Sequence, residues 1–423
     1  MNNPIKYLFL LLLSVGTFTL STAQYKTKAL QDNIKTVQVS IVGSNKFAEP
    51  VIELKGNQVI KISFDEMSHD SHNYLYTVEH CNVDWTPSSI SPLEWANGFT
   101  SNITVTDEQM SQNTTVNYTH YAISLPNEDL RFKVSGNYVI SFYEDSNPDV
   151  KVATACFSIV DSKVAVDATV RGNTDIDING KMQQLDFTIL TGNYAIDNPL
   201  SELKLIVCQN GRYDNMVTDL TPNSITKNKI GYTNNKALIF EGGIEYHSFD
   251  ISSIYAFGEG VNKIRFYDPY YHAELFPDKI DPWAAYIYKQ DVDGKFVVNI
   301  QNQDDDDVWA DYILVHFTLP TEKPFFDGFV YLLGGFNYNQ LDDAVRMTYN
   351  TTLNAYEKTV LLKQGGYNYL YGFVQKGTST ASTKQIESSH WETENKYTIY
   401  IYQRAFGDRY DKLIGVKILQ SGK

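Results

Sequence analysis

Hydrophobic and polar residues alternate with a period of two along most of this 423-residue chain. Such alternation is typical of β-strands that have one buried face and one exposed face. Clusters of Asn, Gly, Asp and Pro separate the short runs, and no sustained helical period follows residue 23. We therefore predict an all-β fold built from antiparallel β-sandwiches of immunoglobulin-like or early-set character. The clearest runs are 58–64, 73–80, 138–143, 155–160, 203–208, 263–267, 312–319 and 397–402.

The length of the chain sets the expected number of domains, because 423 residues exceed what one ordinary hydrophobic core supports. Strand runs restart after a short joint at 161–163 and after four consecutive aspartates at 304–307. We expect short helical turns near Pro92 to Ala96 and near Ala273 to Phe276. The expected tandem domains are an N-terminal β-sandwich over 24–160, a middle β-sandwich over 161–303 and a C-terminal early-set-like β-sandwich over 304–423.

The first 23 residues have the layout of a secretory signal peptide. Lys6 precedes an apolar run at 7–13, and the small residues Ser21 and Ala23 precede the expected cleavage point. A membrane anchor is the alternative, but a span needs about 20 apolar residues, and small and polar residues interrupt this run. The sequence therefore predicts an exported protein that is not itself inserted in a membrane.

The charge balance argues against two classes of partner. The chain has 35 basic and 50 acidic residues, a formal net charge of −15. Such a chain repels the phosphate backbone of nucleic acids and anionic membrane surfaces. The counts of Tyr (30) and Phe (22) are high, which suits pleated sheets and also binding faces.

The cysteines do not form a disulfide framework, because Cys81, Cys156 and Cys208 are an odd and sparse set. Buried free thiols are the expected state. The alternative is a bond between Cys81 and Cys156 inside the first domain.

Two clusters have residue types that bind metals. His69, His72 and His80 could bind zinc, but this needs a turn that makes three ligands converge, and the spacing matches no HExxH-type motif. A polar loop is the simpler interpretation. The aspartates at 304–307 could bind calcium, but consecutive acids point in different directions, which favours a solvated linker. We expect no metal and no cofactor.

No catalytic motif is present: the sequence lacks GxSxG, P-loop, GxGxxG and CxxC patterns. Two aromatic loops instead suggest binding, one containing Trp85 and one, at 268–277, containing Tyr271. Aromatic side chains on Pro-stiffened loops lose little entropy when they bind a partner. The alternative is that they cap the ends of the sandwiches. The sequence favours a binding protein over an enzyme.

Several long motifs resemble one known family, and together they span almost the whole mature chain. The motifs lie at 80–88, 113–121, 130–138, 268–271, 362–369, 391–397 and 406–415. They resemble the type IX secretion system plug protein family of Bacteroidota. The resemblance implies a periplasmic protein, expected to be a monomer, that docks on the outer-membrane translocon barrel and seals its periplasmic opening. The candidate interface residues are Trp85, Tyr271, Arg404, Arg409 and Tyr410.

The C-terminal domain resembles a second group, the early-set sandwiches of starch-binding accessory modules, through its motifs at 328–337 and 365–371. Those modules stack sugars on a Trp that follows a Gly-x-Phe-Asn turn. Here Tyr338 and Asn339 follow that turn. The alternative function is therefore a carbohydrate-binding or glycan-processing accessory protein, although its stacking Trp is missing.

Overall fold

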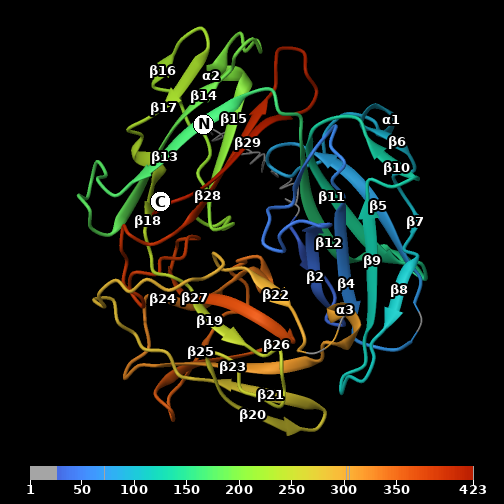
Figure 1. Cartoon of the computed structure of the whole chain (residues 1–423), viewed down its shortest axis with the longest axis vertical. Helices are drawn as coiled ribbons and strands as arrows, with labels where there is room; N and C mark the ends of the chain where they lie inside the picture. The colour runs from blue at the N-terminus through green and yellow to red at the C-terminus, as the bar shows by residue number, and fades with distance from the viewer. Residues whose placement is uncertain (1–25, 71, 302, 304, 423) are drawn as a thin grey trace, which may run out of the picture.

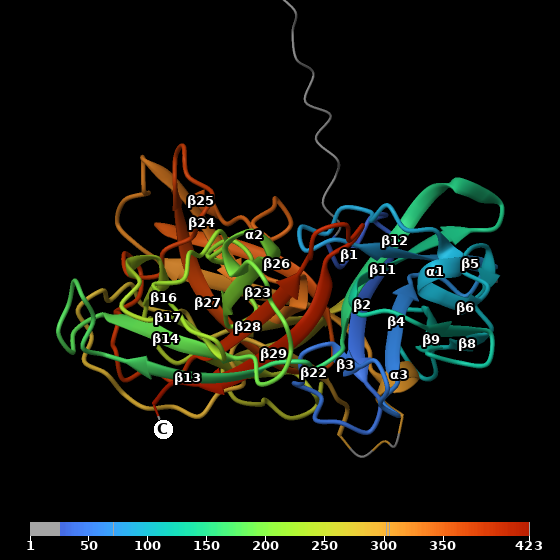
Figure 2. The same cartoon turned by 90° about the horizontal axis from the view of Figure 1, so that it is seen from above.

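The alternating runs form β-strands, and the all-β sandwich fold predicted from them is confirmed in a computed structural model. The structure describes residues 26–70, 72–301, 303 and 305–422. The expected signal peptide lies outside the described residues. Three lobes meet around a shared centre, as Figure 1 shows, and Figure 2 gives the view from above. The described residues contain three one-turn α-helices: α1 (Pro92–Trp95), α2 (Pro199–Glu202) and α3 (Asp306–Trp309).

The helical turn expected near Pro92 is α1, and its sequence explains it. Pro92 occupies the first turn, where its missing N–H is not needed. The backbone N–H of Ser91 donates to the Glu94 carboxylate at 2.8 Å, which satisfies a free donor at the helix start. The second expected turn was wrong: residues 270–275 form a strand, in which Ala273 and Leu275 are buried with a period of two.

The N lobe, which we define as residues 26–160, is a sandwich of two main sheets. One has the order β1-β12-β11-β5-β7, with β3 pairing in parallel with β12, and the other has the order β2-β4-β9-β8. A small pair, β6 and β10, lies beside them. The strands are β1 (Lys28–Ala29), β2 (Ile34–Ile41), β3 (Val51–Glu53), β4 (Ile60–Glu66), β5 (Tyr74–Cys81), β6 (Ala96–Gly98), β7 (Ile103–Thr104), β8 (Asp107–Met110), β9 (Thr119–Leu125), β10 (Leu130–Phe132), β11 (Gly136–Glu144) and β12 (Asn147–Val160).

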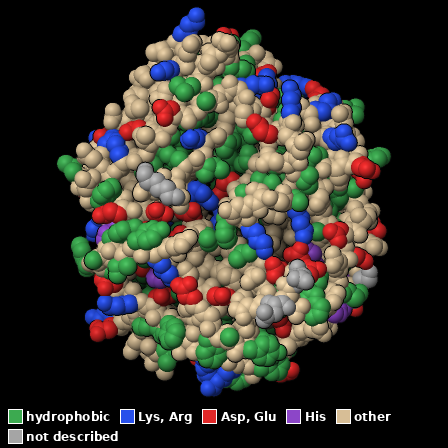
Figure 3. Space-filling view, viewed as in Figure 1, with side chains coloured by type: hydrophobic (Ala, Val, Ile, Leu, Met, Phe, Trp, Pro, Cys, Tyr) green, Lys and Arg blue, Asp and Glu red, His purple; other side chains and the backbone are tan. Residues whose placement is uncertain are grey.

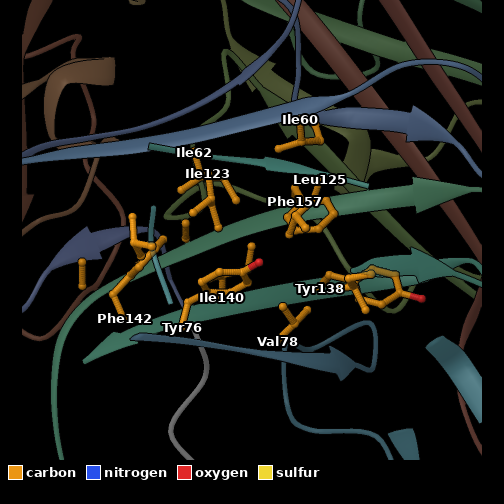
Figure 4. Close-up of a cluster of buried hydrophobic side chains, with 14 of the residues drawn as sticks. Ile60, Ile62, Tyr76, Val78, Ile123, Leu125, Tyr138, Ile140, Phe142 and Phe157 are labelled. Atoms are coloured by element: carbon orange, nitrogen blue, oxygen red, sulfur yellow. The ribbon is translucent and has the colours of Figure 1, made fainter. Parts of the chain in front are cut away.

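Alternate residues of the facing sheets fill the core of the N lobe. Tyr76 and Val78 of β5 lie with Ile140 of β11 on one side, and Ile62 of β4 lies on the other (Figure 4). Full burial of such a side chain contributes roughly 1.5–3 kcal/mol. The period-two pattern of the sequence thus marks the residues that hold the two sheets together.

The middle lobe combines two distant parts of the chain, 163–242 and 393–421. One sheet has the order β13-β14-β17-β16, with β18 beside β14, and the other has the order β15-β28-β29. Antiparallel pairing of β15 with β28 places Leu203 opposite Gln403. The elements are β13 (Ala165–Arg171), β14 (Met182–Leu190), β15 (Leu203–Gln209), β16 (Ser224–Ile225), β17 (Lys229–Tyr232), the 3₁₀ turn η1 (Lys236–Leu238), β18 (Ile239–Glu241), β28 (Lys396–Gln403) and β29 (Lys412–Gln420).

The inserted lobe, residues 243–392 as far as they are described, lies between the two parts of the middle lobe. Its sheets have the orders β20-β21-β23-β26-β25 and β19-β27-β22, with β24 also pairing with β27. The elements are β19 (His247–Asp250), β20 (Val261–Tyr267), β21 (Tyr270–Leu275), β22 (Phe296–Val298), β23 (Tyr312–Pro320), β24 (Gly328–Leu333), the 3₁₀ turn η2 (Gly335–Asn337), β25 (Thr348–Asn350), β26 (Ala355–Lys363) and β27 (Gly365–Gln375).

The hydrophobic cores bear on the expected boundary at 303/304. Phe249 and Leu275 precede that point, yet they share a core with Phe317, which follows it. Val207 likewise shares a core with Ile399. Alternation along the chain reveals strands but not their partners, so it could not show this arrangement. We propose that the three lobes, with a discontinuous middle lobe, are the domains of the chain.

Candidate partner interface

The turn between β28 and β29 lies against the N lobe and is held there by Arg404. The Arg404 Nε atom is 2.9 Å from Oδ1 of buried Asp411, and its guanidinium also donates to the Asn82 side chain. The backbone N–H of Val83 donates to Oδ2 of Asp411 at 3.1 Å, and Lys204 pairs with the same carboxylate at 3.0 Å. In this structure Arg404, one of the predicted interface residues, therefore joins two lobes of its own chain.

Tyr410 and Arg409 fix the same turn from its other side. The Tyr410 ring meets the His80 ring edge-on, with 5.2 Å between centroids. The Arg409 guanidinium pairs with Glu94, and the Ser89 hydroxyl donates to the Arg409 carbonyl at 3.0 Å. Both predicted interface residues thus contact the N lobe, and their contact with another protein stays a prediction.

A glycine makes the His80 contact possible. A Cβ added at Gly136, where φ is +147°, would lie 2.3 Å from Nε2 of His80. His80 is buried, its Nδ1 is 2.8 Å from the Ser88 hydroxyl, and burial lowers its pKa to about 4. The neutral ring therefore packs between Tyr410 and Tyr138 as part of the lobe junction.

The tip of this turn presents a fully exposed aromatic residue, Phe406. The backbone N–H of Ala405 donates to Oδ2 of Asp408 at 3.0 Å, and Asp408 pairs with Lys412 at 2.9 Å. Gly407 adopts φ +90°, a conformation that favours glycine. Sequence reasoning missed Phe406, although the Phe-Gly-Asp triplet within a long motif was a usable signal. A rigid turn with one projecting aromatic side chain is suited to anchoring a partner.

Tyr271 lies on an exposed aromatic surface at the β20–β21 hairpin. Its ring is 5.0 Å from that of Phe266, to which it is paired across the two strands. Phe266 and Tyr267 of the same hairpin are exposed, as are the nearby Tyr255 and Phe257. Hydrophobic side chains gather over this end of the inserted lobe, at the bottom of Figure 3. Of the five predicted interface residues, Tyr271 is the one placed on an open aromatic surface.

Trp85 occupies a buried turn of the N lobe. It adopts φ +63°, which bulky residues rarely do, and it packs with Cys81, Val139 and Cys156. Its backbone N–H donates to the Asn82 carbonyl at 3.0 Å. Trp85 therefore supports the strand end next to the C-terminal turn.

All three cysteines are buried and free, as the sparse set indicated, and the alternative Cys81–Cys156 bond is not formed. Burial raises the pKa of the Cys156 and Cys208 thiols to about 12. Thiols are nucleophilic only as thiolates, so both side chains react only slowly at neutral pH.

The three histidines considered for zinc have separate partners. His69 Nε2 is 2.9 Å from the Ser111 hydroxyl, and His72 Nδ1 is 2.7 Å from Glu66, while His80 lies at the lobe junction. Among the residues that the structure describes, no group of three or more His, Cys, Asp or Glu side chains is arranged to hold a metal ion.

The aspartates considered for calcium form ion pairs instead, and the expectation of a solvated linker there was wrong. Asp306 pairs with Lys46 at 3.1 Å and Asp307 with Lys61 at 2.6 Å, so this segment ties the inserted lobe to the N lobe. Asp305 caps α3 by accepting from the backbone N–H of Asp307. Asp304 lies outside the described residues.

Two further findings bear on the binding classes considered. Within the described part of the chain, no helix has the length and apolar character needed to cross a bilayer. Tyr338, which follows the Gly-x-Phe-Asn turn, directs its hydroxyl to the Val37 carbonyl of the N lobe at 3.1 Å. The side chain at this position therefore contributes to the junction between the inserted lobe and the N lobe.

Comparisons with known proteins identify the family. The model of the type 9 secretion system plug protein 1st domain matches residues 34–161, which correspond to the N lobe. A crystal structure of a hypothetical protein from Parabacteroides merdae is 45% identical, covers 94% of this chain and 100% of its own, and superposes with a TM-score of 0.92. A marsupial T cell receptor aligns with a TM-score of only 0.17. No curated protein matches the chain. The chain belongs to the type 9 secretion system plug protein family.

Proposed function

We propose that this protein is a periplasmic plug, which docks on the periplasmic opening of the outer-membrane barrel of the type 9 secretion system and closes it when no cargo crosses. It acts through binding and not through catalysis. The match of residues 34–161 to the plug family model is the observation that carries this proposal. A wide aqueous channel in the outer membrane would leak small solutes, so a folded stopper has a clear physical purpose.

The geometry supports an interface with two aromatic contact points. Phe406 projects from a turn that is fixed by hydrogen bonds and ion pairs, and Tyr271 lies among exposed aromatic side chains. Aromatic anchors on rigid supports contribute much of the affinity of protein interfaces, because little conformational entropy is lost on binding. In this proposal, Arg404, Arg409 and Tyr410 hold the Phe406 turn in its binding conformation.

Affinity purification tests the partner. A tagged full-length chain, expressed in its organism of origin with residues 1–23 present to direct export, should co-purify with one large outer-membrane barrel of the secretion system from detergent-solubilised envelopes. Phe406→Ser should weaken the purified complex by roughly 30-fold, the effect of a hot-spot residue of about 2 kcal/mol. Phe326→Ser is the matched control, because Phe326 is exposed on another loop. Purification without any barrel would refute the proposed partner.

Sealing needs a separate measurement, because a bound protein need not close a pore. The purified barrel in a planar bilayer should conduct ions, and the mature chain added from the periplasmic side should reduce that conductance at concentrations that saturate binding. Unchanged conductance in a saturated complex would show that the protein binds the barrel without plugging it.

A further inference from the structure

The three lobes surround a cavity of about 920 Å³ that is partly open to the surface. Figure 3 shows the surface hollowed between the lobes, with charged side chains around the margin. Each lobe contributes to the wall: Trp85 and Cys156 from the N lobe, Tyr213 and Tyr400 from the middle lobe, and Asn339 from the inserted lobe. The volume lies within the range of about 300–1,000 Å³ that small-molecule sites occupy.

Tyr213 shows that the cavity is a space within the protein. Its side chain is so surrounded by protein that burial raises the pKa of its hydroxyl far above the usual value. Even so, 42% of its surface is accessible, and the residue lines the cavity. The accessible part of the ring therefore faces the internal space. Tyr400 lines the same space, and burial raises its pKa in the same way.

Polar groups in the wall lack partners of their own. The side chain of Asn339 is 7% exposed, and its Oδ1 atom accepts no hydrogen bond. Oδ1 of Asp293 is also buried without a partner. Among the described residues, the hydroxyls of Tyr213 and Tyr400 make no hydrogen bond either. Buried polar atoms are nearly always paired, so Asn339 and Asp293 indicate a bound molecule that has hydrogen-bond donors, and the two tyrosine hydroxyls offer it further donors and acceptors.

The charges of the wall select against an ionic ligand. Glu49 lies between Lys295 and Lys396, at 2.8 and 3.0 Å. Burial raises the pKa of nearby Asp293 to about 6, although the charges of the same two lysines oppose this rise. Elsewhere in the wall Lys46 pairs with Asp306 and Lys61 with Asp307, so most charged groups that line the cavity already have a partner of opposite sign. An ion of either sign would gain little there and would lose its hydration. A fully apolar ligand would leave Asn339 unpaired, which is also unfavourable.

We propose that this cavity binds a short neutral saccharide, held by hydrogen bonds to Asn339, Tyr213 and Tyr400 and by contact of its C–H faces with the aromatic rings. Hydroxyl groups supply donors and acceptors without charge. The ligand touches all three lobes, so binding fixes their relative positions. This inference is independent of the partner barrel.

Calorimetric titration of the purified mature chain tests it, with maltotetraose, cellotetraose and chitotetraose as probes. At least one probe should bind saturably with one site per chain and raise the unfolding temperature. The double variant Tyr213→Phe/Tyr400→Phe keeps both rings and should weaken binding by roughly two- to tenfold per hydroxyl removed. Tyr255→Phe is the matched control, because Tyr255 is an exposed tyrosine away from the cavity. Circular dichroism of the unliganded variants checks that they fold.

The native thiols provide a second readout. Cys156 and Cys208 line the cavity, whereas Cys81 does not. A bound probe should slow alkylation of Cys156 and Cys208 several-fold and leave Cys81 unchanged. Absence of binding by all three probes at millimolar concentration would overturn the proposal and leave water as the occupant. If a probe binds but the double variant binds it equally well and the alkylation of Cys156 and Cys208 is unchanged, the sugar binds elsewhere and the assignment to the cavity is overturned.

Discussion

Replacing Lys363 by methionine should destabilise the junction between the N lobe and the inserted lobe. The Lys363 ammonium donates to Oδ2 of Asp65 at 2.6 Å and to the Asp307 carbonyl at 2.6 Å. The side chains of Lys363 and Asp65 are 2% and 1% exposed. The Tyr312 hydroxyl donates to the same Asp65 oxygen at 2.6 Å, and His120 lies 2.6 Å from the other. The buried carboxylate thus has three partners from two lobes.

The magnitude follows from burial. Removing one partner of a buried ion pair costs about 3–5 kcal/mol, because the remaining charge is left without compensation. Tyr312 and His120 still contact Asp65 in the variant, so we expect about 3 kcal/mol for Lys363→Met. Burial alone would raise the pKa of Asp65, but Lys363 and His120 together hold it below its usual value. Loss of Lys363 should therefore raise that pKa, so the destabilisation by Lys363→Met should be largest near neutral pH and become smaller as the pH falls and Asp65 is protonated.

Equilibrium unfolding in urea, followed by tryptophan fluorescence, measures the change, and limited proteolysis reports separation of the lobes. The double variant Asp65→Asn/Lys363→Met should lose less stability than the sum of the single changes, because no unpaired charge remains. Lys46→Met is the control: Lys46 pairs with Asp306 on the surface, and its loss should cost less than about 1 kcal/mol. A Lys363→Met effect as small as this control, or strict additivity in the double variant, would refute the reasoning.

Three further predictions concern pH and the C-terminal turn. Burial would raise the pKa of Glu49, but Lys295 and Lys396 lower it to about 2 from 4.5. Up to about 3 kcal/mol of stability should therefore be present above pH 4.5 and be lost as the pH falls toward 2. In unfolding measurements over this acid range, the stability of Glu49→Gln should not show this loss. Burial raises the pKa of Glu245 to about 7, so the stability of the native chain should fall as the pH rises from about 4.5 through 7. The stability of Glu245→Gln should change less over this range, and this variant should be more stable than the native chain at pH 8. Tyr410→Ala should cost about 2–3 kcal/mol in urea unfolding and weaken barrel binding although Phe406 is intact; undiminished binding would show that the turn does not depend on its support.

The sequence predicted strands well where one face is buried, because burial imposes the alternation itself. The run at 397–402 falls within β28, for example. The strand partner of β28 could not be predicted, because β15 lies almost half the chain away and nothing local specifies it. The aspartates at 305–307 were misinterpreted for the same reason, since their cationic partners Lys46 and Lys61 are distant in sequence.

The candidate interface shows a second limit of sequence reasoning. Arg404, Arg409 and Tyr410 are residue types that favour protein interfaces, and the structure places them at a junction between lobes of one chain. The physical chemistry of an internal junction and of an external interface is the same, so composition cannot distinguish them. Exposure is an additional criterion, and Phe406 is the fully exposed aromatic residue of this turn.

The pairing of β15 with β28, which in turn pairs with β29, has a consequence for the synthesis of the chain. A chain that is synthesised from its N-terminus presents Leu203–Gln209 long before Lys396–Gln403 arrives. Until then one edge of β15 has no neighbour, and the ends of a loop of almost 200 residues have yet to meet, which slows closure. Until the inserted lobe has been synthesised, this unpaired edge of β15 is therefore able to pair with strands of other proteins. Removal of the last twenty residues would therefore expose the core of the middle lobe, and its effect would not be confined to the end of the chain.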